Sequence, residues 1–334
     1  FNGETPAVTP LVLSGEVDYA THGFPPATEK EFIQQGIRII RVPTYAYVAL
    51  IFNNNVYPLN VKEVRQAIAY AFKRDEAGYL SRGDSAKKII YMTGMSDNLV
   101  SYWLSNTVIK RLNRYDYNPE LASQMLTKLG FKKGPDGIWI TDKGQKMEFE
   151  VLVAAEYADS CATAEYVAGE LTKFGIKCTV RTATYAQVPT EIRTGRFQMA
   201  VQVMGAAHPH AHFSYYTDLV AWNYPSGFGP GVNFPLTQTT KSVGKVDLDK
   251  LITQSAEGYD IAIQKKAIEK LALAFNELLP HVPIWDVYGN NPVIDGKRVT
   301  GWLPEKDPIY KNPVYADNFA ILMILNGTLK PVTK

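Results

Sequence analysis

The sequence predicts an α/β protein with a mostly parallel sheet, and three observations support this class. Between residues 147 and 204, apolar runs of strand length alternate with helical segments. Gly175 and Gly195 each follow a helical segment and precede the next apolar run, as helix stop signals do. The chain has 334 residues, of which 46% are hydrophobic and 20% charged, so it can bury a large core.

The first elements are two strands and a helix. Residues 37–42 and 45–52 are apolar runs of strand length, and the second is continuous, as in a strand buried on both faces,. Asn60 and Glu63 have the spacing of a capping box and predict a helix over residues 61–73,. A later helix begins at Asn118, its expected N-cap, followed by a proline,.

The next elements form a βαβαβ unit, with strands at 147–154, 176–182 and 197–204 and helices at 160–174 and 185–194,. This order implies parallel strands joined by right-handed crossovers. Two further helices and a strand, at 247–256, 261–279 and 281–287, complete the pattern. Ligands of open α/β sheets lie beyond the carboxyl ends of the strands. We therefore expect a ligand site just after Ala154 and Met204.

Charge and spacing argue against several classes of protein. The chain carries 35 Lys and Arg against 33 Asp and Glu, a net charge of +2, so nucleic acid is not an expected partner. No apolar run reaches the roughly 20 residues of a membrane-spanning helix. Cys161 and Cys178 flank a long helix and lack metal-ligand spacing,, so two free, buried thiols are expected. The start at Phe1, with neither Met nor a leader, predicts a processed or truncated product,.

Residues 204–240 form an unusual segment. They contain one formally charged side chain, Asp218, together with seven aromatic residues, three histidines and two asparagines. The segment is long for a connection and follows the end of a predicted strand. Aromatic faces with neutral hydrogen-bonding groups suit a ligand without net charge. A binding loop is the favoured interpretation, and a loop whose rings only pack against the core is the alternative.

Two other kinds of chemistry can be read from the same residues. His208, His210 and His212 alternate, so an extended chain would place them on one face, a spacing that a transition metal could use,. No carboxylate or thiolate stands beside them, so no metal or cofactor is predicted. Asp218 could form a glycosidase-like pair with Glu156 or Asp159, but no catalytic motif accompanies these residues, and solvated loop carboxylates are the preferred interpretation.

Several blocks of the sequence, in order, resemble the large solute-binding proteins of bacterial ABC importers, the family 5 extracellular proteins that include oligopeptide-, dipeptide-, nickel- and oligosaccharide-binding members. The matching blocks are LSGEVDYA at 13–20, LNVKEVRQAIAYA at 59–71, YNPELASQMLTKLG at 117–130, the hairpin at 136–149, GIK at 175–177 and TGRFQMA at 194–200. The resemblance implies a lobe like those of type II periplasmic binding proteins and a protein that is not an enzyme.

The resemblance also implies a domain map. Complete members have two lobes, and the SGE block lies well inside the first lobe. Residues 1–45 and 309–334 are therefore expected to be remnants of the first lobe, and residues 46–308 the second lobe, which forms half of the ligand cleft. The crossings would lie at 45–53 and 299–309. A chain lacking most of one lobe should not close, so weak or absent sugar binding is expected.

The family resemblance bears on the ligand as well. Peptide-binding members carry an aspartate after the strand that matches 197–204, whereas this chain has Gly-Ala-Ala-His-Pro-His at 205–210. An ammonium buried there without a carboxylate would be costly. The expected ligand is therefore a neutral oligosaccharide, such as a β-linked gluco- or manno-oligosaccharide. A peptide receptor of the same family is the alternative, and a glycoside hydrolase is a third, less favoured one.

The predicted ligand-binding residues are mostly in the aromatic segment. Trp222 would stack on a pyranose ring, with Tyr215, Tyr216 and Phe213 extending the platform. Hydrogen bonds would come from His208, His210, Asn223 and Asn53, and Trp285 would lie near the face between the lobes. The implied partners are the oligosaccharide and the membrane permease of an ABC transporter. The implied location is periplasmic or extracytoplasmic, at the membrane through the permease, and the expected state is a monomer.

Overall fold

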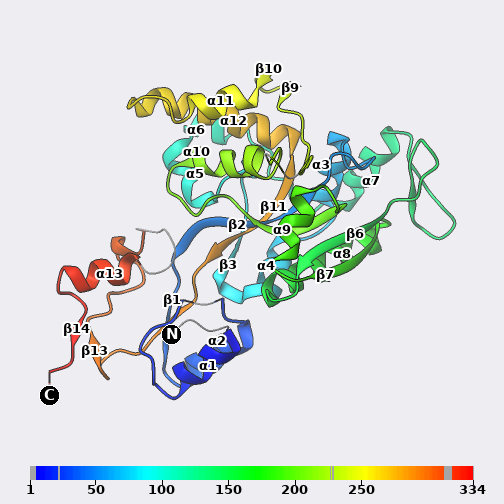
Figure 1. Cartoon of the computed structure of the whole chain (residues 1–334). Coiled ribbons are helices and arrows are strands. Elements are labelled where there is room, and N and C mark those ends of the chain that lie inside the picture. Colours follow the sequence, from blue (N-terminus) through cyan, green and yellow to red (C-terminus); the bar gives the residue numbers. More distant parts are fainter. Residues whose placement is uncertain (1–4, 22, 226, 228, 312–317, 334) are drawn as a thin grey trace.

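The computed structural model describes residues 5–21, 23–225, 227, 229–311 and 318–333. It divides into a large unit, residues 43–288, and a small unit made of residues before 43 and after 288 (Figure 1). Each unit has its own buried apolar residues. Among the described helices, none is long and apolar enough to cross a membrane.

A mixed sheet of six strands forms the centre of the large unit. Its order is β3 (Ala86–Lys88), β11 (His281–Tyr288), β2 (Pro43–Phe52), β8 (Met199–Met204), β6 (Glu148–Ala154) and β7 (Lys177–Ala183). The predicted βαβαβ unit is confirmed, because β6 pairs in parallel with both β7 and β8. The sheet as a whole is mixed rather than mostly parallel, since β2 is antiparallel to β8 and β11, and β11 is antiparallel to β3.

Helices cover both faces of this sheet. On one face α4 (Arg74–Arg82) packs against β3 and β11, and α8 (Ala158–Phe174) packs against β6, β7 and β8. On the other face α5 (Asp97–Trp103) packs against β2. The remaining helices of the large unit are α3 (Lys62–Tyr70), α6 (Asn106–Ile109), α7 (Pro119–Lys128), α9 (Gln187–Arg193), α10 (Ala211–Tyr216), the π turn η2 (Thr217–Ala221), α11 (Leu248–Gln254) and α12 (Ile261–Leu278), with the short 3₁₀ turn η1 (Gly83–Ser85).

Two small hairpins lie at the rim of the large unit, β4–β5 (Lys132–Lys133, Trp139–Ile140) and β9–β10 (Thr237–Thr240, Gly244–Asp247). The predicted cap of α7 is confirmed, because the Asn118 side chain accepts a hydrogen bond from the Leu121 amide. The capping box predicted for α3 is wrong. Val61 is the N-cap of that helix, and it makes no side-chain capping bond.

The small unit consists of α1 (Thr5–Leu13), α2 (Pro26–Gln34), β1 (Arg38–Ile40), β12 (Asn291–Val293), β13 (Val299–Thr300), η3 (Pro308–Lys311), α13 (Asn318–Leu325) and β14 (Lys330–Pro331). The predicted boundary near residue 308 is corrected here. Trp302 and Tyr310 pack with Ile40, Val42 and Val293 in one apolar cluster. The chain therefore returns to the small unit at residues 289–291, directly after β11.

Two adjacent chain segments join the units. β1 leads into β2, and β11 leads into β12. These segments pair with each other on both sides of the junction: Pro43 is opposite Tyr288, and Ile40 is opposite Asn291. The Gly289 amide donates to the Val42 carbonyl at 2.8 Å between the two ladders. The connection is therefore a nearly continuous two-stranded ribbon, and it can be followed in Figure 1.

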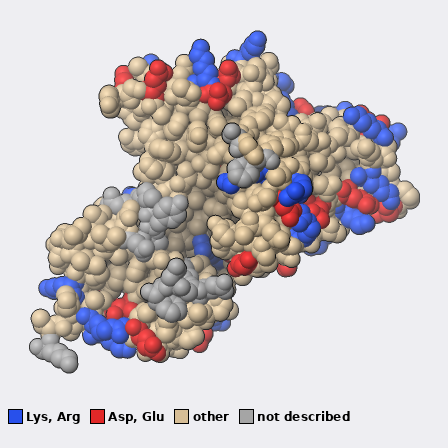
Figure 2. All heavy atoms as spheres, in the orientation of Figure 1, with Lys and Arg blue, Asp and Glu red and all other residues tan. Residues whose placement is uncertain are grey.

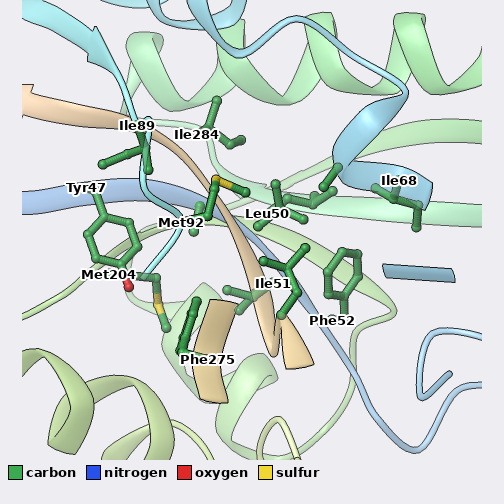
Figure 3. Packing of buried hydrophobic residues seen from close by; sticks show 14 of the residues in the cluster. Tyr47, Leu50, Ile51, Phe52, Ile68, Ile89, Met92, Met204, Phe275 and Ile284 are labelled. Atoms are coloured by element: carbon green, nitrogen blue, oxygen red, sulfur yellow. The ribbon is translucent and has the colours of Figure 1, made fainter. Parts of the chain in front are cut away.

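Strand β2 is the most buried element of the large unit. Its eight residues from Tyr45 to Phe52 are all buried, which confirms the strand predicted from the continuous apolar run. A strand between neighbours on both edges and helices on both faces has no solvent side, so apolar residues occupy both of its faces. Leu50, Ile51 and Phe52 pack near Ile68, Phe275 and Ile284 (Figure 3).

The two thiols are free, as predicted, but each is only half-buried. The Cys161 thiol donates to the Ala154 carbonyl at 3.3 Å. Burial raises the pKa of Cys178 to about 12, so this thiol stays protonated at neutral pH. Both cysteines lie in or beside the βαβαβ unit and act as small packing residues.

The burial of β2 predicts a large stability effect for Ile51→Ala. The side chain has 0% exposure, and its loss leaves a cavity that should lower the free energy of unfolding by about 2–5 kcal/mol. Urea unfolding followed by circular dichroism measures this change. Ile263→Ala is the matched control, because Ile263 is 57% exposed and should change stability by less than about 0.5 kcal/mol. Equal effects of the two substitutions would contradict the assignment of β2 to the core.

Candidate functional site

The carboxyl ends of β6, β7 and β8 lie at the edge of the sheet that faces the small unit. Ala154 is opposite Ala183 at the ends of β6 and β7, and Met204 at the end of β8 is opposite Tyr47 near the start of β2. The edge is therefore formed by three strand ends together with the ribbon that joins the units. Figure 2 shows a concave region between the two units on the face in view, with most charged side chains at its outer margins.

A first hollow of about 620 Å³ lies at this edge. Its lining includes Val203, Gly205 and the next two alanines after β8, together with the hydroxyls of Thr44 and Thr217 and the amide of Asn291. Val203 is 46% exposed. The lining is thus mostly neutral, with hydroxyl, amide and backbone groups beside small apolar surfaces, and Arg82 is its charged residue.

A second hollow of about 610 Å³ adjoins the first. It lies beyond the ends of β6 and β7 and is lined by Glu156, Tyr157, Asp159 and Tyr185, with Pro6 from the small unit. Thr21, Gly23 and Arg82 line both hollows. The two spaces therefore meet around Arg82 and form one extended cleft along the edge of the sheet.

Arg82 lies between the units at the point where the hollows meet. Its Nη1 donates to the Tyr288 carbonyl at 3.3 Å, and its Nε lies 3.6 Å from Oδ2 of Asp159. A Cβ atom on Gly23 would lie 2.0 Å from Nη2, so the guanidinium rests directly against the backbone of the small unit. The Nε atom is buried and has no hydrogen-bond partner in the described part of the chain.

A buried polar network supports the floor of the first hollow. Asp218 accepts a hydrogen bond from the Gly205 amide at 2.9 Å and another from the Tyr47 hydroxyl. His281 Nε2 lies 2.9 Å from the Tyr47 hydroxyl oxygen. Burial raises the pKa of Asp218 to about 7 and lowers the pKa of His281 to about 3. At neutral pH the imidazole is therefore neutral and the carboxyl group is close to its midpoint.

The loop after β8 has an unusual backbone. Gly205 has φ of 75° and Ala207 has φ of 48°, the left-handed region that a residue with a side chain adopts at a cost. The bond from the Gly205 amide to Asp218 holds this turn over the network below it. Asp218 therefore positions backbone groups that line the first hollow.

Four of the predicted ligand-binding side chains are in the core instead. Asn53, Tyr215, Asn223 and Trp285 have 2%, 0%, 0% and 0% exposure. Asn53 and Asn223 bond backbone carbonyls, Tyr215 donates to the Thr93 carbonyl, and Trp285 donates to Thr163 on α8. Their polar atoms are satisfied within the fold and no surface of these side chains is open to the cleft, so the prediction for these four is corrected.

Trp222 is half-buried and lies away from both hollows. After α10 and the π turn its ring packs beside Arg193 of α9, with the guanidinium carbon 5.0 Å from the ring centroid. The chain between Thr217 and Trp222 leads away from the end of β8. The predicted stacking of Trp222 on a ligand in this cleft therefore has no support from its position.

Phe213 and Tyr216 remain at the surface, 42% and 48% exposed. With Thr217, which lines the first hollow, they are spaced i, i+3 and i+4 and so share a helix face. The His208 ring lies 4.2 Å from the Phe213 ring, centroid to centroid. Phe213 and Tyr216 are the part of the predicted aromatic platform that stays exposed, next to Thr217 of the first hollow.

The alternating histidines do not share one open face. His210 packs against Trp103 at 4.3 Å between ring centroids, and its Nε2 lies 3.2 Å from the Gln264 side-chain oxygen. His212 Nδ1 lies 2.9 Å from the Ile252 carbonyl. No group of three potential ligands in the described ranges could hold a metal ion. His210 is the N-cap of α10 and His212 lies in its first turn, so the chain is not extended here and the three side chains have different surroundings.

The carboxylate pair drawn from the sequence is also separated. Asp218 has 2% exposure, and both of its oxygens accept hydrogen bonds under the floor of the cleft. Glu156 is exposed in the second hollow, where it accepts a hydrogen bond from the Tyr185 amide at 2.8 Å. These two carboxyl groups therefore cannot flank one bond of a substrate.

Sequence reasoning predicted the sheet edge where the hollows lie but did not select several residues that line them. The expected places after Ala154 and Met204 are the places where the hollows lie. Arg82, Thr44, Tyr157 and Tyr185 were not selected. The two tyrosines could have been found, because each follows the end of a predicted parallel strand,. Arg82 could not, since its role depends on the packing of α4 against the ribbon.

The fold and the cleft are those of a two-unit α/β protein whose cleft lies at the carboxyl edge of a sheet. A sequence model of the family described as "Bacterial extracellular solute-binding proteins, family 5 Middle" matches residues 1–225. The chain belongs to this family. A protein of Deinococcus radiodurans named as a probable ABC transporter-binding protein is 35% identical over 80 residues, which is 24% of this chain and 14% of the relative.

Several solved structures share the fold at low sequence identity. A mannohexaose-bound periplasmic oligopeptide-binding protein of an ABC transporter from Thermotoga maritima has a TM-score of 0.76 and 17% identity, over 99% of this chain and 61% of that one. The nonapeptide complex of an oligopeptide-binding protein from Bacillus subtilis has a TM-score of 0.71 and 17% identity, over 99% and 59%.

A binding protein in complex with agropinic acid from A. tumefacien R10 has a TM-score of 0.67 and 20% identity, over 100% of this chain and 60% of that one. The chain thus spans about 60% of the length of these solved relatives. The likeness confirms the fold of a type II periplasmic binding protein. The ligands differ among these structures, so the fold does not select one.

Asp218→Asn should remove one source of pH dependence from stability. The folded-state pKa of Asp218, about 7, is above its ordinary value of 3.8 because of burial. Well below pH 3.8 the Asp218 carboxyl group is protonated in both the folded and the unfolded protein. As pH rises from about 4 to about 7 the carboxyl group ionises in the unfolded chain but stays protonated in the folded one. The wild type therefore loses stability relative to Asp218→Asn over this range. At about 1.4 kcal/mol per pKa unit the difference is roughly 4 kcal/mol.

Urea unfolding of both proteins at several pH values measures this difference. The amide oxygen of asparagine can still accept from the Gly205 amide, so the variant is expected to fold. Subtracting the two curves removes the effects of other buried groups, such as His281. Parallel stability curves from pH 4 to pH 8 would contradict the assignment of the shifted pKa to Asp218.

Proposed function

We propose that this chain is the solute-binding component of a bacterial ABC importer and that it captures a neutral oligosaccharide in the cleft between its two units for delivery to the membrane permease. The observation that carries the proposal is the largely neutral lining of the first hollow, in a chain whose family is established. The hydroxyls of Thr44 and Thr217 and the backbone after β8 line this hollow without net charge.

The ligand class is supported by two further points. Hydroxyl-rich ligands pair with neutral donors and acceptors and place their apolar ring faces on aromatic or aliphatic surfaces. Phe213 and Tyr216 are exposed aromatic side chains on the helix face that they share with Thr217 of the first hollow. The Thermotoga maritima relative with the same fold is described as bound to mannohexaose. A β-linked gluco- or manno-oligosaccharide is therefore the first ligand to test.

The proposal also covers how the two units would close on the ligand and where the protein would act. The small unit would belong to the first lobe of the family and the large unit to the second. The ribbon formed by β1–β2 and β11–β12 would act as the hinge, and closure would be driven by contacts that the ligand makes to both units. The partner would be the permease, the location periplasmic or extracytoplasmic, and the state monomeric, without nucleic acid, metal or cofactor.

An oligopeptide is the alternative ligand, and one observation favours it. Glu156 and Asp159 place carboxylates in the second hollow, where a ligand ammonium could pair with them. The aspartate that peptide-binding members are expected to carry after β8 is still absent from this chain.

Saturation-transfer NMR with panels of oligosaccharides and short peptides tests the proposed function. This method detects weak as well as moderate affinities. The proposal predicts saturation transfer to cello- or manno-oligosaccharides, and loss of that signal when Thr217→Val removes a hydroxyl from the first hollow. The substitution keeps the size of the side chain. Transfer to peptides and to no sugar would overturn the oligosaccharide assignment and favour the peptide alternative.

A further inference from the structure

The second hollow contains a pair of exposed aromatic rings that no predicted site includes. Tyr157 follows β6 and Tyr185 follows β7, and they are 44% and 54% exposed. Because β6 and β7 are parallel neighbours whose ends are in register, the two rings meet. Their centroids are 5.2 Å apart, and the planes are nearly perpendicular, at 84°. They form the aromatic wall of a concave space instead of filling the core.

The charged side chains around these rings are two carboxylates, Glu156 and Asp159, and the guanidinium of Arg82. Glu156 accepts a hydrogen bond from the Tyr185 amide at 2.8 Å, which fixes the two loops against each other. Asp159 accepts from the Ser160 amide at 2.7 Å and faces Arg82 at 3.6 Å. Burial, with the neighbouring tyrosine and carboxylates, raises the pKa of Tyr157 to about 12. Its phenol is therefore a neutral hydrogen-bond donor at physiological pH.

This combination has a specific chemical match. A pyranose ring presents an apolar C–H face, which stacks on an aromatic ring, and a rim of neighbouring hydroxyls. Two adjacent hydroxyls can donate to one carboxylate, and a guanidinium can donate to a pair of hydroxyl oxygens. Arg82 lines both hollows, so its guanidinium is placed where ligand hydroxyls would pass from one hollow to the other. The Arg82–Asp159 pair is neutral as a whole, and Glu156 is the one further charged side chain among the described residues of the lining.

The two hollows are connected. Thr21, Gly23 and Arg82 line both of them, so a ligand that fills the first hollow can extend past Arg82 into the second. Each hollow has a volume of about 600 Å³, which is in the range of sites for small ligands. A single short ligand would fill one hollow, and a chain of several rings would be needed to occupy both.

We infer that the hollow lined by Tyr157, Tyr185, Glu156 and Asp159 is a second sugar subsite, reached past Arg82, that selects oligosaccharides long enough to fill both hollows. This inference rests on the proposed function. It adds to that function the place where aromatic rings contact the oligosaccharide and a preference for longer oligosaccharides. The stacking rings come from the loops after β6 and β7, rather than from Trp222 in the aromatic segment.

The test compares a disaccharide with a hexasaccharide of the same series, by calorimetry or saturation-transfer NMR titration of the 334-residue chain. Tyr157→Ala and Tyr185→Ala should each weaken hexasaccharide binding about three- to tenfold, the value of one aromatic contact. Disaccharide binding should not change. Both side chains are largely exposed, so the variants are expected to fold. Tyr259→Ala is the control, because Tyr259 is fully exposed between α11 and α12.

The outcomes separate this inference from the proposed function. If sugars bind but the tyrosine variants match the control at both lengths, the second subsite is wrong and the proposed function stands. If both lengths lose affinity equally, the disaccharide already occupies the tyrosine hollow and the assignment as a second subsite is wrong. If no sugar binds the wild type and a short peptide does, with a loss in the tyrosine variants, the proposed function itself is overturned.

Discussion

The antiparallel pairing of β2 with β11 is the interaction on which the rest of the structure depends. It lies in the middle of the six-stranded sheet, buried between helices on both faces, and its two strands continue into β1 and β12 of the small unit. One ribbon thus anchors the core of the large unit and carries the only described strands that pass between the units. A rigid centre with a thin connection is the arrangement needed for a hinge.

The same pairing determines where the cleft lies. Because β2 starts and β11 ends at the edge where the parallel strands β6 and β8 end, the ribbon leaves the sheet beside the loops that line the hollows. The small unit is therefore held opposite these loops. Arg82 belongs to α4, yet it contacts Tyr288 of the ribbon and lies against Gly23 of the small unit. A movement of one unit relative to the other at the junction would therefore change the surroundings of Arg82.

The polar groups at this edge of the sheet are of two kinds: some are buried and bond one another, and others are exposed in the cleft. Asp218, Tyr47 and His281 satisfy one another below the floor, where desolvation holds the imidazole neutral and shifts the carboxyl pKa upward. Such a network stabilises a precise backbone position for Gly205, because an unsatisfied buried group would be costly. Glu156 and Tyr185 lie outside it and keep surface that a ligand can contact. The fold thus decides which polar groups of this edge are exposed in the cleft.

The sequence by itself determined the parallel βαβαβ unit and the strand ends that border the cleft, because these depend on local periodicity and stop signals. The order of its sequence blocks indicated the family. The sequence did not determine which aromatic and amide side chains are exposed in the cleft. Tyr215 and Asn223 are as polar and aromatic as Tyr157 and Tyr185, but they lie under α10 and its π turn instead of beyond a strand end. Only tertiary packing decides that choice, since burial is a property of what surrounds a residue and not of its type.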